Sequence, residues 1–123
     1  MITAIALTLL TSCAGKVKID PNAEVVLAYQ YEGTSVTSTL TGNNASLVIN
    51  NLNGLEITDE APKDANYVDG VYFMIGEEFY HVDLNGSAVL MIGDKEGYVE
   101  LEHYRFDALM ALFEQFGVSI HSH

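Results

Sequence analysis

The side chains best suited to acid–base or metal chemistry gather in one short stretch, where Glu78, His81 and Asp83 lie close together and His103 follows farther along. Carboxylates and imidazoles transfer protons near neutral pH and bind divalent metals. On a strand, His81 and Asp83 would share one face while Glu78 would lie on the other. Because this spacing matches no strong metal template, we expect a solvated polar face that binds no metal and no cofactor.

Other catalytic and ligand-binding motifs are absent from the sequence. The stretch Asp83–Ser87 begins like a calcium loop, but Gly86 comes too early in it. The 123 residues contain no Gly-rich phosphate loop, no dinucleotide fingerprint and no nucleophile elbow. His121 and His123 are typical of a frayed tail. We therefore predict that the protein is not an enzyme, and a hydrolase that uses His81 and a carboxylate is the least favoured alternative.

The net charge restricts the partners that the protein can have. The chain has 17 acidic and 5 basic residues, which gives a net charge of −12. Such a field repels nucleic acid and attracts basic proteins, so we expect no nucleic-acid partner and consider a basic protein partner. The acidic residues expected to contact it are Glu77, Glu78, Glu100 and Glu102. The alternative, that the charge serves solubility alone, stays open.

Tyrosine is a second feature that suits binding. The chain has 7 tyrosines and no tryptophan, and three tyrosines fall in expected strands, namely Tyr29, Tyr31 and Tyr98. Exposed tyrosine is favoured at binding surfaces, but tyrosine is also common at the rim of a small core. Both interpretations stay open from the sequence.

The only cysteine, Cys13, closes an apolar run at the start of the chain. Met1–Leu10 has the length of a signal-peptide core and is too short to cross a bilayer. The run ends in Leu10-Thr11-Ser12-Cys13, which resembles the lipobox of bacterial lipoproteins, whether encoded by a bacterium or by a phage. The resemblance implies that the signal is cut just before Cys13 and that this residue is lipidated.

This resemblance also implies a domain organisation and a location. Residues 1–12 would be a cleaved signal peptide, residues 13–23 a lipidated tether, and residues 24–123 a single β-rich domain. Several acyl chains on one residue anchor a protein firmly in a membrane. Ala14, rather than aspartate, follows the cysteine, and in lipoproteins of enteric-type bacteria this favours the outer membrane, facing the periplasm. The sequence departs from the pattern in one respect, since no basic residue precedes Lys16.

The expected function is that of a lipid-anchored cell-envelope protein with a small, acidic, monomeric and non-catalytic binding domain. Membrane attachment through Cys13 would come from the lipid, because the net charge of −12 is repelled by anionic headgroups. The alternative is an uncleaved, β-rich structural subunit of an assembly such as a virion, in which residues 2–10 form a strand.

The elements that must position these residues begin with short apolar runs separated by Gly and Asn. A turn is expected at residues 42–44 and the longest loop at Asp59–Asn66. Four strands are expected in this half of the chain: Val25–Tyr31, Ser35–Thr41, Ser46–Asn50 and Leu55–Thr58.

The second half of the chain contains an internal repeat. Met74-Ile75-Gly76-Glu77 recurs as Met91-Ile92-Gly93-Asp94, and Asn85-Gly86 between the copies is a strong hairpin signal. Gly70–His103 is therefore predicted to be a four-stranded antiparallel meander of two similar hairpins under the same packing constraints. Val71–Ile75 and Ala88–Ile92 are apolar on both faces, which predicts central strands covered on both sides.

One element is predicted to be helical, near the end of the chain. Asp107 is the expected N-cap and Gly117 the expected stop. The apolar stripe of this helix consists of Phe106, Leu109, Phe113 and Phe116. The predicted fold class is thus α+β: mainly an antiparallel β-meander of about six to eight short strands, with one C-terminal amphipathic helix packed on the sheet.

Overall fold

The chain folds into a six-stranded antiparallel sheet with helices on one side, and the computed structural model describes residues 15–120. The strand order in the sheet is β2-β1-β3-β4-β5-β6. This arrangement confirms the predicted α+β fold with a C-terminal helix. In chain order, the elements are β1 (Val25–Tyr31), β2 (Thr34–Leu40), α2 (Gly42–Leu52), β3 (Tyr67–Ile75), β4 (Glu78–Asp83), β5 (Val89–Ile92), β6 (Gly97–Glu100) and α3 (His103–Glu114).

The strands β3 to β6 form the predicted meander, in which each strand pairs with the next along the chain. The connection between β3 and β4 is tight, because Ile75 pairs directly with Glu78. Asn85-Gly86 lies in the connection between β4 and β5, where Gly86 has a positive φ of 92° that residues with a side chain rarely adopt. The two copies of the sequence repeat therefore form the hairpins β3–β4 and β5–β6.

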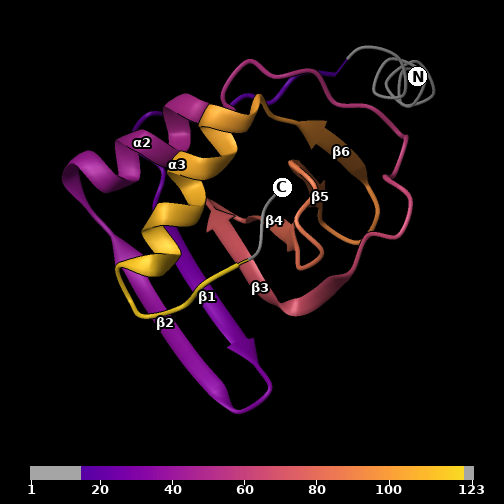
Figure 1. Ribbon diagram of the computed structural model, residues 1–123. Coiled ribbons are helices and arrows are strands. Elements are labelled where there is room, and N and C mark those ends of the chain that lie inside the picture. The colour runs from indigo at the N-terminus through magenta and orange to yellow at the C-terminus, as the bar shows by residue number, and fades with distance from the viewer. Residues whose placement is uncertain (1–14, 121–123) are drawn as a thin grey trace.

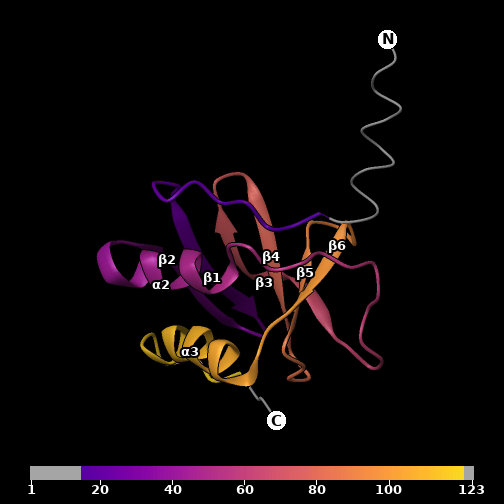
Figure 2. The ribbon, with the colours of Figure 1, turned by 90° about the horizontal axis from the view of Figure 1, so that it is seen from above.

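The core lies between the helices and one face of the sheet. The two views place α2 and α3 on the same side of β1 and β3 (Figures 1 and 2). Phe113 of α3 is central to this contact, because its ring centroid lies 5.1 Å from that of Phe73 and 6.5 Å from that of Tyr29. Phe73, Phe106 and Phe113 are fully buried.

The C-terminal helix is present but begins earlier than expected. It starts at His103, because its first hydrogen bonds are accepted by the carbonyl of Glu102, so the N-cap predicted at Asp107 is wrong. Three of the four stripe residues are buried, whereas Phe116 lies beyond the last turn and is 38% exposed. Gly117 ends the helix as predicted, with a φ of 82° that allows the chain to leave the helix axis.

The segment after β2 is a helix, so the predictions of a turn at residues 42–44 and a strand at Ser46–Asn50 are wrong. Branched Val48 and Ile49 favour a strand by local propensity. The apolar positions nevertheless follow helical spacing, and this face packs into the core. Its buried or partly buried members are Ala45, Val48, Ile49 and Leu52.

The segment Leu55–Thr58, also expected as a strand, makes only isolated bridges, to Lys16 and to Tyr98. Beside the first bridge, the Val17 N–H donates to the Leu55 carbonyl at 2.8 Å, and the Val17 side chain is 2% exposed. Part of the segment expected to be a tether is therefore packed on the domain, whose folded part begins before residue 24. The alternation of charged and apolar residues around Val17 was the signal for this pairing.

The second face of the sheet is more open than the sequence suggested. In β3, Val71 and Phe73 face the helices and are fully buried, while Tyr72 and Met74 on the other face are half-buried. The expectation that Val71–Ile75 is covered on both sides is thus wrong, because both described helices lie on one face. Neither α2 nor α3 is long and apolar enough to cross a membrane.

Candidate functional site

The face of the sheet that lacks the helices presents one continuous row of side chains. Cross-strand pairing aligns Ala28 with Tyr72, then Tyr72 with His81, His81 with Met91, and Met91 with Tyr98. Directly opposed residues on neighbouring strands are close enough for their side chains to pack. His81 of β4 therefore lies in the middle of this row, flanked by an aromatic ring and a methionine.

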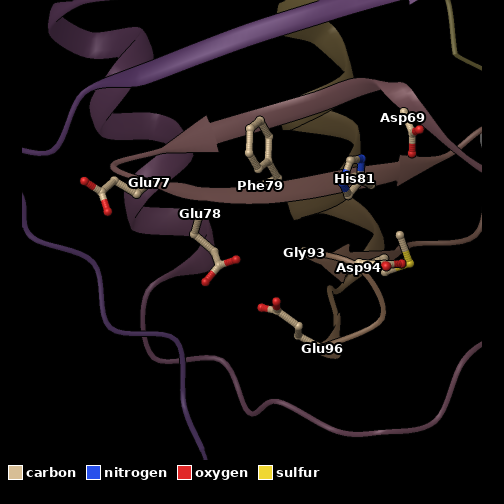
Figure 3. A pocket seen from close by; sticks show the side chains of 9 residues that line it. Asp69, Glu77, Glu78, Phe79, His81, Gly93, Asp94 and Glu96 are labelled. Atoms are coloured by element: carbon tan, nitrogen blue, oxygen red, sulfur yellow. The ribbon is translucent and has the colours of Figure 1, made fainter.

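A pocket of 680 Å³ opens beside this row, and Figure 3 shows side chains from two turns around it. Five of its nine lining residues are acidic and none is a lysine or arginine, although Lys95 belongs to one of the turns. We call it the acidic pocket. Its lining residues are Asp69, Glu77, Glu78, Phe79, His81, Met91, Gly93, Asp94 and Glu96.

The two turns that line the acidic pocket are the two copies of the sequence repeat. Gly76-Glu77 connects β3 to β4, and Gly93-Asp94 begins the connection from β5 to β6. In an antiparallel meander, alternate connections lie at the same end of the sheet. Shared packing constraints explain why the hairpins are alike, but they do not require both turns to be acidic. The repeat thus brings carboxylates from both turns to one space.

Three aromatic rings form one wall of this region. The Tyr72 and Phe79 centroids lie 4.9 Å apart with an interplanar angle of 86°, and the Phe79 and His81 rings stack at 6.0 Å with an angle of 18°. Phe79 remains 36% exposed. Aromatic faces attract cations through their quadrupole. The aromatic wall and the negative charge of the neighbouring turns therefore both favour a bound cation.

His81 is the buried polar group of the site. It is only 9% exposed, and its Nδ1 has no hydrogen-bond partner within the part of the chain that the structure describes. The prediction of a solvated face is therefore wrong at His81, because Tyr72, Phe79 and Met91 surround the ring. An unpaired buried polar atom costs about 1–3 kcal/mol. The ring thus holds a polar atom that no group of residues 15–120 satisfies.

Glu78, at the start of β4, and Glu96, in the β5–β6 connection, extend into the same space (Figure 3). Burial raises the pKa of Glu78 above its ordinary value of 4.5, and the charge of Glu96 raises it further. Glu96 in turn packs over Gly93, where a Cβ would lie 2.6 Å from its Oε1. Within residues 15–120, no carboxylate of the acidic pocket forms an ion pair. The pocket therefore concentrates negative charge, and no ion pair within residues 15–120 offsets it.

The structure separates the four residues singled out for metal chemistry. Glu78 and His81 line the acidic pocket, whereas Asp83 and His103 line a second pocket of 290 Å³ beside the β4–β5 connection. Residues 15–120 contain no group of three or more histidine, cysteine, aspartate or glutamate side chains arranged to hold a metal ion.

Asp83 is occupied by the backbone around it. Its carboxylate accepts the N–H groups of Asn66 at 2.7 Å, Asn85 at 2.9 Å and Ser87 at 3.1 Å, and the residue is 1% exposed. The carboxylate therefore ties the β4–β5 connection to the start of β3.

The three tyrosines considered for binding do not form one face. Tyr29 and Tyr31 pack edge to face at 6.3 Å, and Tyr29 also contacts Phe113 on the helix side of the sheet. Tyr98 belongs to the row on the other face, where it is 8% exposed and packs against Tyr67. These contacts favour the interpretation that the tyrosines pack at the edges of the core.

The four acidic residues expected to contact a partner divide between two places. Glu77 and Glu78 line the acidic pocket, while Glu100 and Glu102 line a separate pocket with Pro62 and other residues. A basic partner that covers one pair therefore need not touch the other. The sequence repeat could have identified Glu77, because the matching residue of the other copy, Asp94, lines the same pocket.

Comparisons with known proteins yield no relative, since no protein-family model, no curated protein and no solved structure matches the chain. Cys13, His121 and His123 lie outside the described residues. The features that point to a function are therefore the acidic pocket and the sequence that ends at Cys13.

Proposed function

We propose that this chain is a lipid-anchored cell-envelope protein whose small acidic domain binds a basic protein and catalyses no reaction. The acidic pocket carries the binding part of this proposal, because five acidic residues and no lysine or arginine line it. In a chain of net charge −12, such a concentration of charge speeds encounters with a positively charged partner and favours the correct one.

The arrangement of potential catalytic groups supports a binding role. A histidine base in a hydrolase needs a nucleophile within hydrogen-bond reach and a group that orients its ring. His81 makes no hydrogen bond with any side chain of residues 15–120, and the Asp83 carboxylate is held by backbone N–H groups. The neighbours of His81 are aromatic rings and a methionine, which suit contact more than proton transfer.

The proposed anchor is tested by growing a bacterial host that expresses the full chain with a labelled fatty acid. We expect label in the mature protein and none in Cys13→Ser, which should accumulate as the longer precursor. An unlabelled, unprocessed wild-type chain would overturn the anchor and favour the structural subunit of an assembly.

The proposed binding is tested by capture from an envelope extract at low and at high salt. We expect a basic protein that is retained at low salt and released as ionic strength rises past ~0.15 M. Neutralising Glu77, Glu78, Glu100 and Glu102 to glutamine should release it as well. A partner whose binding ignores both salt and these substitutions would refute an electrostatic interaction.

A further inference from the structure

We propose that the acidic pocket receives a lysine or arginine side chain of the basic partner, held between the two acidic turns and the ring wall of Phe79 and His81. This inference rests on the proposed function and deepens it, because it names the point of contact and the chemical group that enters. Three features of the pocket lead to this assignment.

The first feature is the charge. Carboxylates from the β3–β4 turn and the β5–β6 turn line one space without an ion pair from residues 15–120. Burial, and after it the negative charge of Glu96, raises the pKa of Glu78 there, so the Glu96 carboxylate adds to the cost of a charged Glu78. A bound cation offsets this cost by attraction. An anionic ligand would increase it, which excludes phosphate-bearing and carboxylate ligands.

The second feature is the aromatic wall. Phe79 stacks on His81 and is 36% exposed, so part of this residue remains within reach of a ligand. A cation over an aromatic face gains about 0.5–1 kcal/mol at an exposed site. An organic cation uses both the ring and the carboxylates, whereas a metal ion needs closely grouped ligands, and residues 15–120 hold no such group. The pocket volume of 680 Å³ also suits a side chain more than a single ion.

The third feature is the orphaned ring nitrogen. His81 is 9% exposed and lines the pocket, yet its Nδ1 has no partner within the described chain. In the neutral tautomer protonated at Nε2, this atom is an acceptor. Lysine and arginine offer several N–H donors and no acceptor. Their side chains therefore supply what the ring lacks as well as the charge that the turns lack.

The test uses the full chain, isotope-labelled for NMR, and titrates it with the peptide acetyl-tetralysine-amide. We expect saturable shifts centred on the signals of Phe79, His81 and Met91. The same peptide with acetylated lysine side chains keeps its length but loses its charge, and it should cause no such shifts. Shifts that spread evenly over the acidic surface, or equal shifts with the acetylated peptide, would overturn the proposal.

Matched variants separate the pocket from the overall charge. Glu78→Gln/Glu96→Gln removes two charges from the acidic pocket, and Asp59→Asn/Glu60→Gln removes two from the exposed loop between Thr58 and β3. We expect the first variant to bind tetralysine about tenfold more weakly and the second to bind nearly as the wild type does. An equal loss of affinity in both variants would show that the peptide responds only to the overall charge, and it would overturn the pocket assignment.

His81→Phe keeps the ring wall and removes the ring nitrogens. We expect this variant to retain the shifts at Phe79 but to bind the peptide several-fold more weakly, because the hydrogen bond is lost. Unchanged affinity would overturn the role of the ring nitrogen. The amide spectrum of each variant reports whether it is folded, so a misfolded protein cannot be mistaken for a weak binder.

The same variants distinguish this inference from the proposed function. If the basic partner is released from Glu100→Gln/Glu102→Gln but not from Glu78→Gln/Glu96→Gln, the domain binds a basic protein elsewhere and the pocket assignment is wrong. If no basic partner is found while tetralysine still binds the pocket, the pocket assignment stands and the proposed function is wrong.

Discussion

Asp83 offers the sharpest test of how the site region is built, because its carboxylate was a candidate ligand and the structure makes it a structural acceptor. One oxygen accepts the N–H groups of Asn66 and Asn85, and the other accepts that of Ser87. Asp83→Asn keeps one oxygen, but it presents an NH2 group to one of these donors. The variant therefore loses a charge-assisted bond and creates a donor–donor contact.

The expected cost follows from burial. A hydrogen bond to a charged group contributes about 1.5–3 kcal/mol, and with Asp83 only 1% exposed, water cannot readily replace it. We expect Asp83→Asn to lower the free energy of unfolding by about 2–3 kcal/mol in urea denaturation of the full chain. Asp83→Ala leaves three donors unpaired and should remove most of a reserve of about 5–15 kcal/mol.

The matched control is Asp64→Asn, which makes the same change at an exposed aspartate next to this connection. Asp64 has a φ of 59°, a conformation that asparagine tolerates well. The stability of Asp64→Asn should therefore stay within about 0.5 kcal/mol of that of the wild type. A stability of Asp83→Asn equal to that of the control would refute the structural role and leave the Asp83 carboxylate free for a ligand.

Three further substitutions test the packing and the charge. Phe113→Ala should cost about 3–5 kcal/mol in urea unfolding because its ring is fully buried, whereas Phe116→Ala, at a residue 38% exposed, should cost far less. Val17→Ala should lower the free energy of unfolding by about 1–2 kcal/mol. The control is Lys18→Ala, at the next residue, which should leave the stability nearly unchanged. Equal stabilities of the two variants would show that this segment is not part of the fold. Glu78→Gln should raise the melting temperature near pH 7. The raised pKa of Glu78 makes the wild type lose stability as the pH rises above 4.5. The gain from the substitution should therefore shrink as the pH falls towards about 4. A gain that is the same at both pH values would show that the charge of Glu78 is not its cause.

The meander could be predicted because its signals are local and agree with each other. Strand-like alternation, Gly turns and Asn85-Gly86 all indicate consecutive hairpins, and the structure confirms them. The helix α2 was missed because the branched side chains at Val48 and Ile49 favour a strand. Only packing against α3 and the sheet stabilises the helical conformation instead. The pairing of Val17 with Leu55 was missed for a related reason, since its partner is distant in sequence.

The acidic pocket was visible in the sequence only in part. The repeated acidic turns are local, and a meander must bring them to one end of the sheet. The burial of His81 is not local, because it depends on Tyr72 and Met91 from the two neighbouring strands. Sequence alternation placed His81 on the correct face, but it could not show that this part of the face is covered by large side chains.

The early start of the folded domain changes how an anchor at Cys13 would hold it. The Ile57 N–H donates to the Gly15 carbonyl at 2.9 Å, so only Ala14 would lie between a lipidated Cys13 and a residue that is bonded to the domain. Since an extended residue spans about 3.3–3.6 Å, the domain would lie within about one Debye length of the headgroups, where charge still acts. Lys16 and Lys18 beside the anchor would be drawn to anionic lipid, and a surface of net charge −12 would be repelled. Under the proposed function, repulsion by anionic lipid disfavours any orientation that turns the five acidic residues of the acidic pocket towards the membrane.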